Sequence, residues 1–253
     1  EGNNRTIDEI LAQNTGNLTE SLEFGNFDQS LEDNTLTLEA GGVTFEVSQT
    51  GEESPLGAAG LQAEEGLEVF DLSDAAENED ETVTARLSFD LISVAAFDNA
   101  IGFYTVENAN GDLAVEDEDG NITQVSPGGE GYLDALLGKA ISNENDDGEE
   151  EDIILTGGAN VDETSADFEF SLQGGQIVVP FIIARGGNLD SLPDSADELP
   201  LRSDIYTPFI GANSDGADHF RLLADNTFGV EDLRGGGDQD FNDIIFQLNF
   251  EVA

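Results

Sequence analysis

A group of oxygen-bearing side chains interleaved with glycine lies near the C-terminus, in residues 229–243. Three consecutive glycines, 235–237, precede a short segment in which Asp and Asn recur. Calcium is a hard cation that takes about 6–8 oxygen ligands from carboxylates, amides and backbone carbonyls. Alternate residues of a loop can converge on such an ion, and glycine permits the tight turns that this requires. The run predicts a calcium site, and the alternative is a polar turn without a metal. The predicted ligands are Glu231, Asp232, Asp238, Asp240, Asn242 and Asp243.

The elements that must position this loop are predicted to be strands. Apolar residues 244–246 follow the loop directly, and Phe241 within it is placed to anchor it to the core. Apolar residues alternate with polar ones over 83–89, 168–172 and 246–252, the period of a half-buried strand. Short strands separated by Gly- and Asn-rich turns predict an all-β fold, a β-sandwich or jelly-roll with one or two short helices.

Helix, turn and boundary signals along the chain refine this prediction. Two segments favour helix, 6–11 with a capping box and 132–141. Alternation over 36–47, interrupted by Gly41 and Gly42, predicts a hairpin. Pro180 within an apolar run predicts an edge position or a bulge. The acidic stretch 73–81 divides an N-terminal extension, 1–80, from a calcium-binding β-sandwich domain, 81–253.

The charge balance restricts the partners of the chain. It has 56 acidic and 7 basic residues among 253, and a formal net charge of −49. Nucleic acid is a poor partner, because phosphate binding needs clustered Lys and Arg. The longest apolar run, 177–184, is far shorter than the roughly 20 residues that span a bilayer, so we expect no membrane insertion. The acidic surface reflects either a saline habitat or a series of cation ligands.

The chain contains neither cysteine nor methionine. Without cysteine there is no disulfide, and bound metal is a substitute for such staples. Without methionine at position 1, we expect an export signal that has been removed from the mature chain.

A family resemblance rests on the C-terminal motifs. Residues 211–223, 225–229 and 231–246 resemble the signature of the domain of unknown function 4114 family, and 95–104 and 174–187 resemble its earlier strands. The resemblance covers roughly 83–250. It implies an extracellular β domain of the kind common in cyanobacteria and in large secreted or surface proteins, with a calcium site and no established activity. It also implies a second oxygen-rich turn over 213–218, with Asn213, Asp215 and Asp218 as ligands.

Catalytic signals are weak. His219 is the only histidine, and beside Asp218 it favours a structural role hydrogen-bonded to a carboxylate over that of a catalytic base. The acidic insert 143–152 matches the first positions of an EF-hand loop, but Ile154 stands where the loop needs Glu. We therefore expect no enzyme and, at most, a loose surface cation site in the insert.

These features predict a secreted calcium-binding structural protein, a self-assembling subunit of an extracellular fibre, sheath or surface layer. Homo-oligomers or filaments are the expected assembly, with the segment 1–30 as an arm that adds a strand to a neighbour. The alternative is a calcium-dependent adhesin that binds extracellular polysaccharide. Trp is absent and there are only 3 Tyr, so the usual residues that stack on sugars are scarce.

Overall fold

The computed structural model describes most of the chain from residue 82 onward and several strands before it. The described residues are 28–32, 35–40, 43–48, 70–71, 82–93, 95, 97–108, 110–116, 120–144, 150–157, 162–173, 175–224, 227–238 and 241–252.

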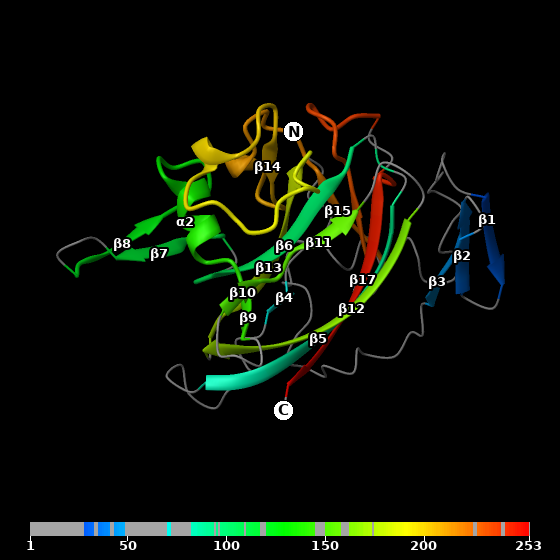
Figure 1. The fold of residues 1–253 in the computed structure, drawn as a ribbon, viewed down its shortest axis with the longest axis horizontal. Helices are drawn as coiled ribbons and strands as arrows, with labels where there is room; N and C mark the ends of the chain where they lie inside the picture. Colours follow the sequence, from blue (N-terminus) through cyan, green and yellow to red (C-terminus); the bar gives the residue numbers. More distant parts are fainter. Residues whose placement is uncertain are drawn as a thin grey trace.

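Two antiparallel five-stranded sheets form the centre of the molecule (Figure 1). The first has the order β11-β6-β13-β14, with β4 also paired to β13, and the second has the order β12-β5-β17-β16-β15. The prediction of an all-β, sandwich-like fold is confirmed. The first sheet contains β4 (Phe70–Asp71), β6 (Asn99–Val106), β11 (Leu155–Gly157), β13 (Ile177–Ala184) and β14 (Asp204–Tyr206). The second contains β5 (Thr82–Ser93), β12 (Asp162–Gln173), β15 (Phe220–Ala224), β16 (Thr227–Val230) and β17 (Ile244–Val252).

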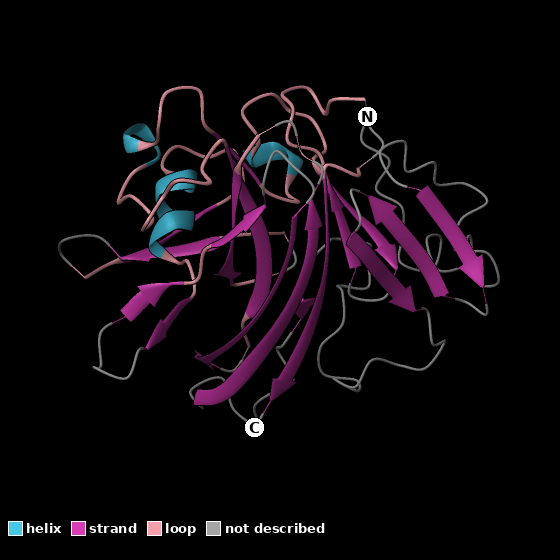
Figure 2. Ribbon diagram, turned by 45° about the vertical axis from the view of Figure 1, so that its right-hand side comes forward, coloured by secondary structure: helices cyan, strands magenta, loops and turns pink. Residues whose placement is uncertain are grey.

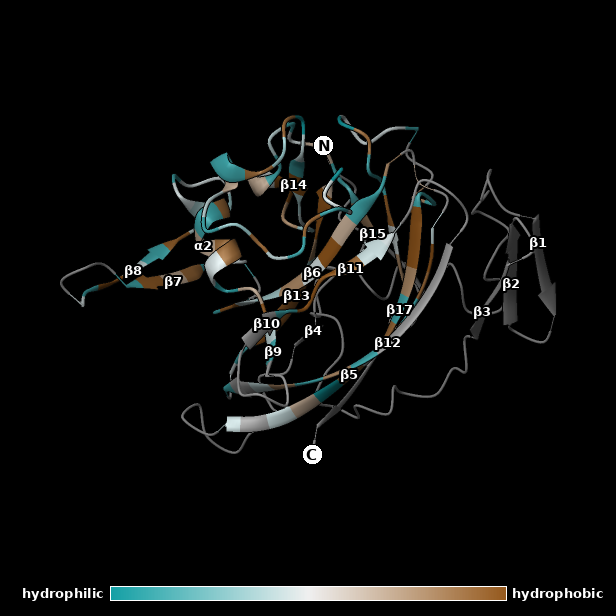
Figure 3. Ribbon diagram, in the orientation of Figure 1, coloured by the Kyte–Doolittle hydropathy of each residue, from teal (hydrophilic) through white to brown (hydrophobic). Residues whose placement is uncertain are grey.

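The main core fills the space between these sheets. The alternation predicted for β5 is present: Ala85, Leu87 and Phe89 are buried, whereas Arg86 is exposed and Ser88 is half-buried. The ring of Phe89 stacks on Phe246 of the same sheet at 5.6 Å and meets Phe103 of the other sheet edge-on at 6.4 Å. Figure 3 shows the hydrophobic colour concentrated on the strands that face this core, such as β6 and β17. The burial of these phenylalanine rings between the sheets therefore holds the two sheets together.

The first sheet is buried on both faces. Every residue of β6 and of β13 is buried, because a second core covers the face that points away from the other sheet. This second core includes Tyr104 and Phe181 from the sheet and Leu136 from α2 (Tyr132–Gly138). The helix predicted over 132–141 is confirmed and is shorter at its end. Its burial against the sheet explains why 177–184 is a continuous apolar run.

Hydroxyl groups cross the second core as a hydrogen-bonded chain. The Tyr104 hydroxyl lies 3.2 Å from that of Tyr132 and 2.8 Å from Oγ1 of Thr207. Tyr132 donates in turn to the carbonyl of Gly111 at 2.9 Å. Burial raises the pKa of Tyr132 to about 12 and that of Tyr104 well above its ordinary value. Both phenols therefore stay neutral and rigidify the core.

Pro180 lies at a local edge of the first sheet, as predicted. On one side it pairs with Phe103 of β6. On the other side, β4 pairs only with residues 177–178 and β14 only with 182–184, so no described strand pairs there with Pro180. Proline lacks the N–H that a ladder needs, and a gap between two partner strands tolerates it.

The remaining described elements are smaller. The hairpin predicted over 36–47 is confirmed: β2 (Thr35–Ala40) pairs with β3 (Val43–Ser48) in a three-stranded sheet. The helix predicted over 6–11 lies outside the described residues. None of the described helices has the length and apolar character to cross a membrane. These elements are β1 (Asp28–Glu32), β2 (Thr35–Ala40), β3 (Val43–Ser48), β7 (Leu113–Glu116), β8 (Ile122–Val125), β9 (Ser142–Glu144), β10 (Glu150–Asp152), η1 (Ala196–Glu198) and η2 (Ile210–Ala212).

Candidate metal loop between β16 and β17

The predicted calcium loop is the connection between the paired strands β16 and β17, residues 231–243. It lies at the end of the sheets where irregular segments gather, the upper end in Figure 2. Its first two residues, Glu231 and Asp232, are each 1% exposed, as is Asn242 near its end. Carboxylates are seldom buried so completely unless they are paired, hydrogen-bonded or bound to a metal.

Glu231 supports the loop from beneath. Its Oε1 accepts a hydrogen bond of 2.8 Å from the backbone N–H of Phe241. The glycines 235–237 all have positive φ, and a Cβ at Gly237 would overlap with Glu231 Oε2. Phe241 itself has a φ of 56°, a left-handed conformation that costs a non-glycine residue about 1–2 kcal/mol. The triple glycine is thus needed because the loop folds directly over this carboxylate.

Asp232 engages the opposite sheet. Its Oδ2 accepts hydrogen bonds from Phe97 N–H at 3.2 Å and from Asn99 Nδ2 at 2.9 Å. Asn99 begins β6 of the first sheet, whereas Asp232 follows β16 of the second, so these bonds tie the two sheets together. The other oxygen, Oδ1, is buried without a hydrogen-bond partner among the described residues.

Asn99 is a functional residue that the sequence prediction missed. It is fully buried, and its Oδ1 accepts from the N–H of Arg185 at 3.1 Å while its amide nitrogen donates to Asp232. It therefore links β6, the end of β13 and the metal loop. Its only signal in the sequence is a polar residue at the start of a buried strand, which does not reveal partners 86 and 133 positions away.

The other predicted ligands of this loop are dispersed. Asp243 Oδ2 accepts from the N–H of Asp232 at 3.0 Å, Asn242 is buried, and Asp238 is exposed. Asp240 lies outside the described residues. Within the described part of the chain, no three Asp, Glu or His side chains gather closely enough to form a metal cluster by themselves.

The second predicted turn, 213–218, braces the first. The Asn213 side chain is committed to backbone groups: Oδ1 accepts from Thr207 N–H, and Nδ2 donates to the carbonyls of Thr207 and Ala217. Asp215 reaches the glycine loop, because its Oδ2 accepts from Gly235 N–H at 2.6 Å. Asn213 therefore fixes its own turn against Thr207, and Asp215 links this turn to the glycine loop.

His219 sits between the two turns with no exposed surface. Its Nδ1 lies 2.7 Å from the Glu231 carbonyl oxygen, and its Nε2 lies 3.1 Å from Asp215 Oδ2. Both partners are acceptors, so the arrangement is satisfied when both ring nitrogens carry hydrogen. The ring also stacks on Tyr206, with centroids 3.5 Å apart and planes 7° from parallel. The predicted hydrogen bond from His219 to a carboxylate is present, and the carboxylate is that of Asp215.

The pKa shifts of the neighbouring carboxyls follow from these contacts. Burial works to raise the pKa of Asp215, but hydrogen bonds from Gly235, Ala217 and His219 outweigh it and lower the pKa. For Asp218, burial is the stronger cause and raises the pKa, against a hydrogen bond from Phe220 N–H. Asp215 is thus held as a carboxylate by donors that the fold aims at it.

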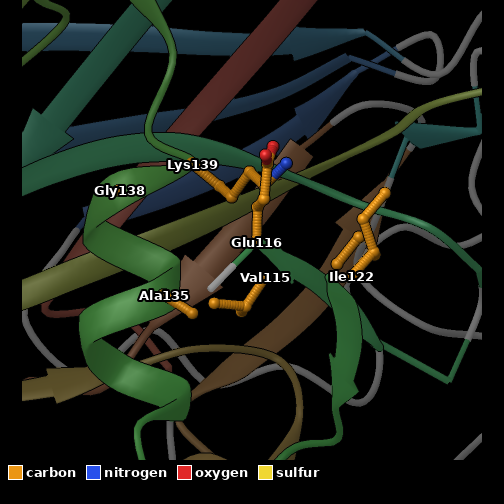
Figure 4. A pocket seen from close by; sticks show the side chains of 7 residues that line it. Val115, Glu116, Ile122, Ala135, Gly138 and Lys139 are labelled. Atoms are coloured by element: carbon orange, nitrogen blue, oxygen red, sulfur yellow. The ribbon is translucent and has the colours of Figure 1, made fainter. Parts of the chain in front are cut away.

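A separate shallow pocket lies between α2 and the β7–β8 hairpin (Figure 4). Its volume is about 330 Å³, and it shares no residue with the metal loop. The walls are aliphatic, and the side chains of Glu116 and Lys139 point the same way at one end. This lining supplies one carboxylate and one amine and suggests no particular reaction. The lining residues are Ala114, Val115, Glu116, Ile122, Ala135, Gly138 and Lys139.

The fold and the loop together define a two-sheet β domain with a buried, oxygen-rich connection at one end. A family model described as a domain of unknown function (DUF4114) matches residues 172–251, which supports the resemblance to that family over this part of the chain. The comparison with curated proteins found no match, and neither did that with solved structures. The matched segment contains β13 to β17, yet β13 pairs with β6 and β17 with β5, both of which lie before it. The sheets therefore need strands from 82–106 as well.

Proposed function

We propose that this chain is an extracellular, self-associating structural protein whose β-sandwich is fastened by calcium in the 231–243 loop. The observation that carries the proposal is Asp232: a carboxylate 1% exposed, in direct contact with both sheets, with one oxygen that has no hydrogen-bond partner among the described residues. A buried carboxylate oxygen without a donor is costly, and a bound cation would remove that cost.

The donor chemistry suits calcium. Asp232 and Asp243 supply hard carboxylate oxygens, and calcium completes its shell with amide and backbone carbonyls as well as carboxylates. Asp232 and Asp243 would hold the ion in this proposal, with Asp240 as a further ligand. The ion would neutralise buried negative charge and fix the loop against β6, and it takes part in no reaction.

The environment of His219 favours a structural over a catalytic role for this end of the molecule. A general base needs a free ring nitrogen within reach of a substrate. Here the ring is fully buried, and both nitrogens are directed at protein acceptors. The residues around the loop are arranged to hold backbone segments together.

Thermal unfolding in calcium tests the proposal. A ligand at 100 times its Kd stabilises the folded state by about 2.7 kcal/mol, which corresponds to a rise in Tm of roughly 5–10 °C for a protein of this size. We expect that rise in millimolar calcium, its reversal by a chelator, and a much smaller response in Asp232→Asn. Asp167→Asn, an exposed carboxylate on β12, is the matched control and should respond like the wild type. A Tm that is the same with calcium and with chelator would refute calcium binding.

A further inference from the structure

Basic residues are scarce in this chain, yet several of them meet at one place. Only 7 of the 253 residues are Lys or Arg. Three of these lie close to the start of β14: Arg185 contacts the backbone of Arg202, which precedes β14 by two residues, and Arg234 contacts Asp204, the first residue of β14. Arg185 Nη1 donates to the carbonyl of Arg202 at 3.0 Å, and Arg234 Nη1 lies 3.4 Å from Asp204 Oδ1. In a chain with a net charge of −49, three of the 7 basic residues thus lie in one small region.

Two of these arginines follow exposed leucines. Leu201 is 91% exposed and Leu233 is 38% exposed, and they are two of the three large hydrophobic side chains that stand out from the described surface. Leu201-Arg202 lies in the turn before β14, and Leu233-Arg234 lies in the metal loop. We call these four residues the Leu-Arg patch.

The patch is held in place by the fold while its side chains remain open. Arg202 has a φ of 75°, a left-handed backbone that non-glycine residues adopt only where their surroundings impose it. Its own guanidinium has no partner among the described residues. Arg234 is 63% exposed, and its contact with Asp204 is long for a salt bridge, so it is available to a stronger acceptor. Arginine is enriched at the centres of protein interfaces, and the exposed leucines beside it add apolar surface that a contact would remove from water.

We propose that the Leu-Arg patch docks on the acidic segment 190–198 of a second copy of this chain. The inference rests on the proposed self-association and names its surface. Charge complementarity selects this partner, because the segment carries four exposed carboxylates just before the patch in sequence: Asp190, Asp194, Asp197 and Glu198. Since one stretch of chain holds both the acidic and the basic part, two copies can pair reciprocally across a twofold axis.

The contact also explains how such an acidic protein can self-associate. Two copies repel each other over most of their surface. The Leu-Arg patch offers a surface where approach brings opposite charges together, and the two leucines are removed from water in the contact. Calcium bound in the 231–243 loop would fix Leu233 and Arg234 in position.

Sedimentation velocity over a range of protein concentrations, in millimolar calcium, tests the proposal. The wild type should self-associate. Arg202→Gln with Arg234→Gln should weaken association by at least about tenfold, as expected for arginines at the centre of an interface. Arg86→Gln is the matched control, because Arg86 is exposed and pairs with Glu169 on the second sheet, and it should leave association unchanged.

Charge reversal identifies the partner surface. Arg202→Glu with Arg234→Glu and Asp194→Arg with Asp197→Arg should each abolish self-association alone, and the two proteins mixed together should form a heterodimer. Wild-type protein that stays monomeric, or a heterodimer that does not form, overturns the proposal. Binding of the patch to an acidic polysaccharide in place of a second copy overturns it as well.

The same proteins separate this inference from the calcium proposal. If calcium raises Tm but the arginine variants associate like the wild type, the docking surface is wrong and the calcium site stands. If calcium leaves Tm unchanged but the arginine variants lose association, the surface stands and the calcium site is wrong.

Discussion

Replacing Asp232 by Ala probes the contact between the two sheets. The substitution removes the acceptor of the half-buried Phe97 N–H and one of the two acceptors of Asn99 Nδ2, which also donates to the carbonyl of Phe97. Each buried donor that loses its partner costs about 1–3 kcal/mol, so the free energy of unfolding should fall by about 2–6 kcal/mol. Natural domains have about 5–15 kcal/mol in total, and the loss is therefore a large fraction of the stability. In thermal unfolding it corresponds to a decrease in Tm of roughly 5–20 °C.

The assay is urea denaturation followed by circular dichroism, in chelator so that cation binding does not contribute. Asp232→Asn keeps a carbonyl oxygen at the site and should cost less than Asp232→Ala, about 1–3 kcal/mol. Asp167→Ala removes an exposed carboxylate and should change stability by no more than about 0.5 kcal/mol. If Asp232→Ala proves as stable as Asp167→Ala, the tie between β16 and β6 does not exist, and the reasoning built on it fails.

Three further substitutions are measured in the same urea assay. Gly237→Ala should lower the free energy of unfolding by about 1–2 kcal/mol more than Gly235→Ala does. Both positions have a positive φ, but only at 237 would a Cβ collide with the Glu231 carboxylate. Equal losses would show that the loop is not packed on that side chain. His219→Gln should cost about 2–4 kcal/mol through the loss of two buried hydrogen bonds and a stacked ring, and near-wild-type stability would contradict the bracing role. Tyr132→Phe should cost about 1–2 kcal/mol because a buried carbonyl loses its donor, and an unchanged midpoint would place the hydroxyl outside the network.

Local patterns in the sequence were sufficient to predict several of the strands and the helix. The alternation over 83–89 and 246–252 matches β5 and β17, the glycine pair at 41–42 marks the β2–β3 turn, and the helical pattern at 132–141 matches α2. These features depend on residues a few positions apart, and burial of one face or one stripe selects them. The glycines 235–237 likewise predicted a loop with unusual backbone angles, which the positive φ values confirm.

The sequence alone determined that this is an all-β protein of extreme acidity with an oxygen-rich loop before its last strand. Only the tertiary structure decided what the side chains of that loop contact. Neighbours along an extended chain point to opposite sides, so Glu231 lies under its own loop while Asp232 reaches Asn99 in the other sheet. Adjacent acidic residues suggested a single ligand set, but the two side chains have different partners, and the partner of Asp232 lies 133 positions away in the sequence.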